Sequence, residues 1–72
     1  MQHLTAIIER EDKVYVALCA ELDIASQGGS VEEARKNLTE AVELFFETAD
    51  PSEVNQRLSG EVYVTTLDVA CG

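Results

Sequence analysis

One long amphipathic helix constrains the fold of this chain more than any other feature of its sequence. Between residues 31 and 49, apolar side chains recur at steps of three and four, which places them on one stripe of a helix. The stripe consists of Val31, Ala34, Leu38, Ala41, Val42, Phe45 and Ala49. Ser30 precedes the stripe and Glu33 follows three residues later, which is the spacing of a capping box. We therefore predict a helix over residues 30–48 whose apolar side covers a sheet.

The segments that flank this helix alternate between apolar and polar residues, as strands do. The predicted strands are residues 3–10, 13–20, 24–27 and 61–70. Glu11-Asp12 is the expected turn between the first two, and Asp50-Pro51 starts a shorter helix over residues 51–58. The expected fold is one α+β domain over residues 1–72 in the order β-β-β-α-(α)-β. Its four-stranded sheet has one main helix on one face, and the last strand lies parallel to the third.

Both faces of this sheet are expected to need cover. The apolar positions of the last strand change face, which indicates a bulge or burial on both sides; they are Val62, Val64, Leu67 and Val69. On the face away from the helix we expect another apolar group, formed by Ile7, Tyr15, Ala17 and Cys19. A chain of 72 residues has room for only a small core. We therefore predict that a second subunit covers this face, in a homodimer or a homotetramer.

The charge of the chain restricts its partners. Fourteen acidic residues against five basic ones give a net charge of −9 at pH 7. The five bases are scattered, whereas binding to nucleic acid needs clustered lysine and arginine. We expect no direct binding to nucleic acid. A basic protein is the favoured partner, because its charge would also speed the encounter.

The sequence also predicts where the protein resides. No apolar run approaches the roughly 20 residues that a membrane helix needs, and the first residues do not resemble a signal peptide. Cys19 and Cys71 are the only thiols and form no zinc-binding spacing. A reducing, cytoplasmic setting fits these features best.

Residues that could carry out catalysis are few. The only histidine, His3, has no nucleophile near it in the sequence, and the two glycines before the long helix lack the spacing of a phosphate-binding loop. Four carboxylates on or near the strands leave a metal-dependent nuclease as an alternative; they are Glu9, Glu21, Asp23 and Asp68. Since any acidic chain supplies such residues by chance, we predict no enzyme, no cofactor and no metal.

The polar side of the long helix is unusually acidic. Glu43 and Glu47 repel each other at a spacing of four, near the helix end that favours cations. This pattern indicates a surface for a cationic partner, although a solvated helix face is the alternative. The residues that we predict to contact a partner lie on the helix and around the first hairpin: Glu40, Glu43, Leu44, Phe46, Glu47, Glu9, Glu11 and Asp12.

About half of the chain resembles the HicB family of antitoxins, including its short stand-alone members. The shared features run from Tyr15 to Glu47. They are the Tyr-Val-Ala strand, Glu21-Leu22 at its end, Ser26-Gln27-Gly28, the Val31-Glu32-Glu33-Ala34 helix start, Asn37-Leu38 and Glu40-Ala41. One departure is Ala20, where the family often has proline before Glu-Leu.

This resemblance implies a partial ribonuclease-H-like fold without nuclease activity. It implies that the chain neutralises a small basic toxin of the HicA type, an mRNA-cleaving protein, by covering the toxin's RNA-binding and catalytic surface. Longer family members carry a C-terminal DNA-binding domain, which we do not expect here because the sequence stops after the last predicted strand. The alternative within this family is an orphan module that has lost its toxin and associates only with itself.

Overall fold

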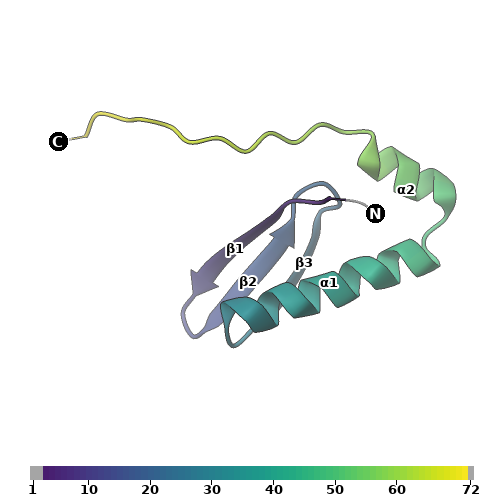
Figure 1. Cartoon of the computed structure of the whole chain (residues 1–72), viewed down its shortest axis with the longest axis horizontal. Coiled ribbons are helices and arrows are strands. Elements are labelled where there is room, and N and C mark those ends of the chain that lie inside the picture. The colour runs from purple at the N-terminus through teal and green to yellow at the C-terminus, as the bar shows by residue number, and fades with distance from the viewer. Residues whose placement is uncertain (1–2, 72) are drawn as a thin grey trace.

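The computed structural model of the protein describes residues 3–71, which form a small α+β domain with an extended arm (Figure 1). Its elements are β1 (Ala6–Glu11), β2 (Val14–Cys19), β3 (Ile24–Gly28), α1 (Val31–Thr48) and α2 (Pro51–Leu58). The three strands form an antiparallel sheet in the order β1-β2-β3. Within the described residues, no helix is both long and apolar enough to cross a membrane.

The start of α1 is held by a reciprocal pair of hydrogen bonds, as its sequence predicts. The Glu33 N–H donates to Ser30 Oγ at 3.1 Å, and Glu33 Oε1 accepts from the Gly29 N–H at 2.9 Å. Gly28 lets the helix start close to β3, because a Cβ at this position would lie 2.6 Å from the Ala34 backbone nitrogen. The predicted helix and its cap are therefore confirmed.

The β1–β2 turn lies one residue later than the sequence predicts. It consists of Asp12 and Lys13, since β1 continues to Glu11 and β2 begins at Val14. Asp12 has φ 57°, a left-handed conformation that aspartate tolerates better than most residues. This turn sets the register of the hairpin and places Ile7 opposite Leu18.

That register contradicts our expectation for β2, although Ile7 of β1 lies on the expected face. Side chains alternate along a strand, so Ile7 shares its face with Leu18 and not with Ala17 or Cys19. Ala17 and Cys19 lie under α1, fully or almost fully buried, with Tyr15 packed against them. The prediction that Tyr15, Ala17 and Cys19 face away from the helix is thus wrong. The small side chains of Ala17 and Cys19 let the helix approach the sheet closely.

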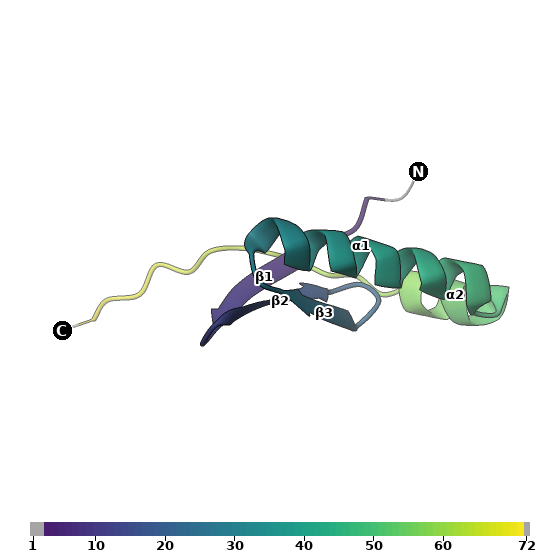
Figure 2. The same cartoon turned by 90° about the horizontal axis from the view of Figure 1, so that it is seen from below.

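The core is a single layer between α1 and the sheet. Its buried members are Ala17, Cys19, Leu22, Ala34 and Leu38. Figure 2 shows α1 along one side of the sheet, and none of the elements formed by residues 3–71 lies on the other side. The helix packs mainly on β3 and β2, and least on β1. The domain therefore has one covered sheet face and one open one.

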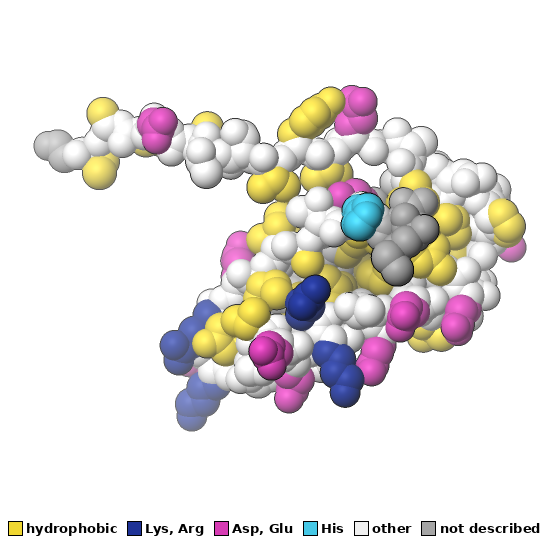
Figure 3. Space-filling model, viewed as in Figure 1, with side chains coloured by type: hydrophobic (Ala, Val, Ile, Leu, Met, Phe, Trp, Pro, Cys, Tyr) yellow, Lys and Arg dark blue, Asp and Glu magenta, His cyan; other side chains and the backbone are white. Residues whose placement is uncertain are grey.

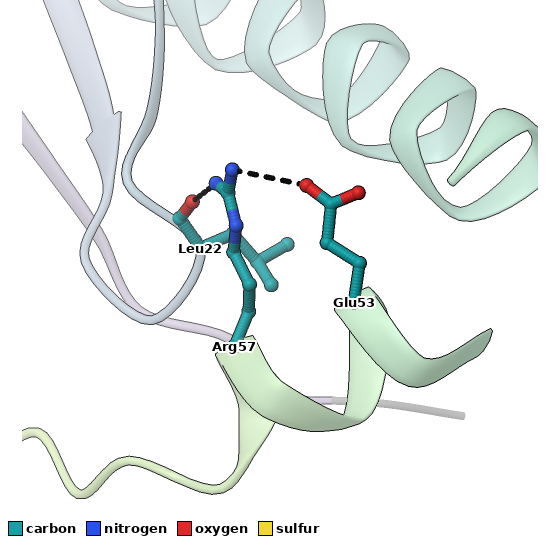
Figure 4. A network of polar contacts seen from close by, with 3 residues as sticks. All are labelled: Leu22, Glu53 and Arg57. Atoms are coloured by element: carbon teal, nitrogen blue, oxygen red, sulfur yellow. Dashed lines mark hydrogen bonds and ion pairs between the residues drawn. The ribbon is translucent and has the colours of Figure 1, made fainter. Parts of the chain in front are cut away.

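The short helix α2 is confirmed over residues 51–58, and one arginine fastens it to the domain. Arg57 donates a hydrogen bond to the Leu22 carbonyl, pairs with Glu53 at 3.3 Å, and places its guanidinium 5.2 Å from the centre of the Phe45 ring (Figure 4). The expected cap Asp50 occupies the N-cap position without a side-chain hydrogen bond. The Arg57 contacts hold α2 beside the β2–β3 loop.

The prediction of a four-stranded sheet is wrong. Residues 61–71 are extended, but they lie outside the three-stranded sheet and are exposed along their whole length. Valine, threonine and tyrosine favour a strand only where a neighbouring strand and a surface to pack on are present. Because the apolar residues of this segment change face at its middle, neither side offers the domain a continuous apolar row.

Candidate functional site

The outer side of α1 carries the most distinctive charged surface of the domain. Glu40, Glu43 and Glu47 follow one another at steps of three and four, so neighbouring side chains lie about 5–6 Å apart at Cβ. Leu44 lies among them and is 58% exposed. We call these four residues the α1 acidic surface. It combines three carboxylates with one accessible apolar side chain.

The carboxylates of this surface have no cationic partner within residues 3–71. The one ion pair of the described chain joins Arg57 to Glu53 on α2. The last turn of α1 contains no basic residue, although the negative end of the helix dipole lies there. Figure 3 shows acidic side chains along α1, with lysine and arginine side chains at the hairpin and also beside the acidic ones over the middle of the domain. The surface is therefore a negative region, and the nearby helix residues Arg35 and Lys36 border it without forming an ion pair.

The predicted contact residues of the first hairpin lie elsewhere on the molecule. Glu9 and Glu11 alternate with Ile8, whose side chain packs toward the core, so they point to the open sheet face. Asp12 lies in the turn, at the end of the sheet near the start of α1. The structure thus separates these three residues from the α1 acidic surface, and one flat partner surface does not reach both groups.

Phe46 differs from the other predicted contact residues because it is half-buried. Its ring lies 5.8 Å from that of Phe45 and packs against the core. It also lines a groove of about 610 Å³ between β1 and α1. We therefore assign Phe46 to the edge of the core and to this groove, whereas Leu44 belongs to the outer surface.

The open sheet face carries an apolar row beside Glu9 and Glu11, with a different membership from the one that the sequence predicts. Ile7, Leu18 and Ala25 are opposite one another across the three strands, and Val14 and Val16 extend this row along β2. Ile7 is 40% exposed and Val14 is 36% exposed. Of the residues that we expected on this face, only Ile7 lies there. This uncovered row is a second candidate binding surface.

Glu21 has a structural role that the sequence does not reveal. Its carboxylate accepts hydrogen bonds from the Thr5 N–H at 2.8 Å and from the Thr5 hydroxyl at 2.7 Å. Burial raises the pKa of Glu21, but these hydrogen bonds and a weaker one from the Cys19 thiol outweigh it, so the pKa lies below 4.5. The two residues are 16 positions apart, so no local pattern could have shown this contact.

The carboxylates proposed for a metal-dependent nuclease are not gathered into a site. Among residues 3–71, no group of three or more histidine, cysteine, aspartate or glutamate side chains has the geometry to hold a metal ion. Glu21 uses both carboxylate oxygens on Thr5, and Asp68 lies on the extended segment.

Comparisons of this chain with protein-family models, with curated proteins and with solved structures find no match. The similarity to HicB-type antitoxins therefore stays a prediction from the residues between Tyr15 and Glu47.

Proposed function

We propose that this protein is a non-catalytic binding protein of the antitoxin type, which uses the α1 acidic surface to occupy a small basic toxin. The observation that carries the proposal is the row of carboxylates of Glu40, Glu43 and Glu47, which lacks a cationic partner within residues 3–71. The similarity of residues 15–47 to HicB-type antitoxins supports the same conclusion.

The electrostatic cost of this row is the physical reason to assign it a binding role. Like charges four residues apart destabilise a helix by about 0.2–0.5 kcal/mol, and an acid at the C-terminal end adds about 0.3–1 kcal/mol. Both terms become favourable when a cationic surface binds there. The free chain is therefore less stable than it would be with another sequence at these exposed positions, and the complex recovers the difference.

The proposed mechanism is occupancy. An mRNA-cleaving toxin needs a basic surface to bind RNA phosphates. The carboxylates of α1 compete for that surface, and Leu44 supplies an apolar contact at the centre of the patch. The net charge of −9 speeds the encounter with a basic partner. We place the complex in the cytoplasm, where the unpaired thiols of Cys19 and Cys71 remain reduced.

The test uses the full chain and a candidate toxin, chosen as any small basic protein encoded by a neighbouring gene. We expect the chain to inhibit RNA cleavage by that protein and to bind it with an affinity that falls as salt rises. Replacing Glu40, Glu43 and Glu47 with glutamine removes three charges at nearly constant shape. At about 0.5 kcal/mol for each exposed pair, the affinity should fall about tenfold.

A matched variant identifies the surface. Glu9→Gln with Glu11→Gln removes charge from the opposite face of the sheet and should leave the affinity unchanged. If the hairpin variant weakens binding and the helix variant does not, the assignment of the surface is wrong. If the basic protein still cleaves RNA in the presence of excess chain, the antitoxin function is wrong.

The open sheet face favours a second candidate, a module that associates only with itself. Its apolar row of Ile7, Leu18 and Ala25 is uncovered in the single chain. This candidate predicts self-association without any basic partner. Absence of a gene for a small basic protein nearby, together with a stable oligomer, would favour it over the antitoxin.

A further inference from the structure

The extended segment after α2, residues 61–71, is a strand-forming sequence without a strand to pair with. We call it the arm. Within residues 3–71 it makes no backbone hydrogen bond to any other element, and it projects past the body of the domain (Figures 1 and 3). Tyr63, Leu67 and Val69 are 81%, 82% and 74% exposed. The radius of gyration is 14.3 Å, whereas a compact domain of this length has about 11 Å.

The outer edge of β1 is the complementary feature. The Ala20 N–H donates to the Thr5 carbonyl at 3.1 Å. This bond identifies the residues of β1 whose backbone groups point toward β2. Because these bonds alternate along an antiparallel pair, the backbone groups of Ala6, Ile8 and Arg10 point to the outer edge. A free edge of this kind is a template for another strand.

The edge of β3 is less accessible than that of β1. Asn37 on α1 donates from Nδ2 to the Gln27 carbonyl at 2.8 Å, which covers part of that edge. The helix packs mainly on β3 and β2, so it leaves the β1 side uncovered. An added strand therefore finds its hydrogen-bonding groups at β1.

The groove between β1 and α1 provides the apolar surface that an added strand needs. It has a volume of about 610 Å³ and lies beside the beginning of the free edge, where residues 3–6 line it. Its apolar lining comes from Leu4, Ala6 and Cys19 on the sheet side and from Leu38, Val42 and Phe46 on α1. Side chains on one face of a strand paired with β1 would enter this groove, and those on the other face would extend the open sheet face.

We propose that the arm of one copy of this chain binds as an added strand to the β1 edge of a second copy, and that the second copy does the same in return. Tyr63, Leu67 and Val69 lie on one face of the arm and would fill the groove, while Val62 and Val64 would lie beside Ile7 on the open face. This arrangement gives both apolar faces of the arm a surface to cover.

Three observations favour a second copy as the occupant. In its own chain the arm passes β1 without pairing, although β1 has a free edge and an adjoining groove. The covered core has only five buried side chains, which is little for an independent domain. Reciprocal exchange of an identical element is a low-cost route to a dimer, and it gives the free β1 edge of each copy a hydrogen-bonding partner. This proposal does not depend on a toxin partner.

The test uses the natural cysteines of the full chain. Cys71 lies on the arm and is exposed, whereas Cys19 is 2% exposed, so a nitroxide reagent labels the arm selectively. Nitroxide-labelled chain at natural isotope abundance is mixed with ¹⁵N-enriched chain that carries no nitroxide, and the two are allowed to exchange subunits. We expect a dimer by light scattering. In the NMR spectrum of the ¹⁵N-enriched copy, we expect the nitroxide to broaden the amide signals of Ala6, Ile8 and Arg10.

Two variants locate the contact. Leu67→Asp changes a side chain that touches no other element in the single chain, so the body should fold normally by circular dichroism while the dimer dissociates. Val16→Lys places a charge on the open sheet face beyond the groove and should leave the arm bound. A monomeric wild-type chain overturns the proposal, because the arm then pairs within its own chain or stays free. A dimer that survives Leu67→Asp but not Val16→Lys also overturns it, because the open face is then the interface.

Discussion

Replacing Glu47 with lysine should stabilise the free protein, because Glu47 combines two unfavourable electrostatic interactions. It lies in the last turn of α1, where no basic residue is present, and four residues after Glu43. Glu47→Lys removes the repulsion from Glu43 and creates an attractive pair in the preferred orientation, each worth about 0.2–0.5 kcal/mol. It also reverses the charge at the negative end of the helix dipole. Removing the unfavourable negative charge and adding a favourable positive charge each contribute about 0.3–1 kcal/mol to stability.

Together these terms predict a gain of about 1–2 kcal/mol in the free energy of unfolding, using the lower values for an exposed site. For a domain of this size, the melting temperature should rise by about 5–10 °C. Thermal and urea unfolding followed by circular dichroism at low salt measure the change. In about 1 M salt, where the screening length is about 3 Å, most of the gain should disappear.

The matched control is Glu32→Lys at the other end of the same helix. It changes the net charge by the same amount, so any general relief of repulsion is equal in the two variants. Glu32 lies in the first turn, where the dipole favours an acid, and four residues before Lys36. This variant should be less stable than the Glu47 variant by about 2 kcal/mol. Equal melting temperatures for the two variants, or a gain that persists unchanged at high salt, would refute the local electrostatic reasoning.

Two further substitutions test how the domain is held together. The pKa of Glu21 is lowered in the folded state, so its contribution to stability is present above the unfolded value of 4.5 and is lost as the pH falls through the folded pKa. Glu21→Gln should therefore lower the urea midpoint at neutral pH but not in strong acid, and an equal loss at both pH values would contradict this. A Cβ at Gly28 meets the Ala34 nitrogen at 2.6 Å and other backbone at 2.8 Å, so Gly28→Ala should cost about 1–3 kcal/mol by displacing the start of α1. Gly29→Ala has the Glu33 carboxylate oxygen at 3.8 Å as its nearest neighbour and should be almost neutral in the same unfolding assay.

The parts of the fold that were predicted correctly depend on interactions between near neighbours in the chain. The start of α1 follows from Ser30 and Glu33, three residues apart, and the break before α2 follows from Pro51. The apolar stripe of α1 correctly identified Ala34 and Leu38 as buried. In each case the controlling residues lie within about one helical turn, so their pattern alone is sufficient.

The errors concern contacts between distant segments. Ile7 lies on the open face as expected, but it pairs with Leu18, so it shares that face with Val16 and Leu18 and not with Ala17 or Cys19. The larger side chains of β2 lie on the face turned away from α1; they are Val14, Val16 and Leu18. In the structure α1 lies over the smaller Ala17 and Cys19, where its backbone can approach closely.

The arm shows why strand propensity alone did not determine the sheet. Residues 61–70 have the composition of a strand, yet a strand is stabilised by its neighbours and not by its own backbone. Its apolar residues change face, which predicts a bulge or cover on both sides. If the arm pairs with a second copy, the same feature is explained by a groove on one side and an apolar sheet face on the other.

The two proposed binding surfaces are separable, which allows each to be disproved without the other. The α1 acidic surface points away from the sheet, and the arm-binding groove lies between α1 and β1; only Glu43 borders both. Glu47→Lys should therefore weaken binding of a basic partner without changing the oligomeric state, and Leu67→Asp should dissociate the dimer while each monomer keeps its acidic surface. If Leu67→Asp also abolished binding of the basic partner, a single α1 surface would be insufficient, and the partner would have to contact both copies of the dimer at once. In that case the affinity lost on dissociation would measure the contribution of the second copy, because two linked contacts bind much more tightly than either does alone.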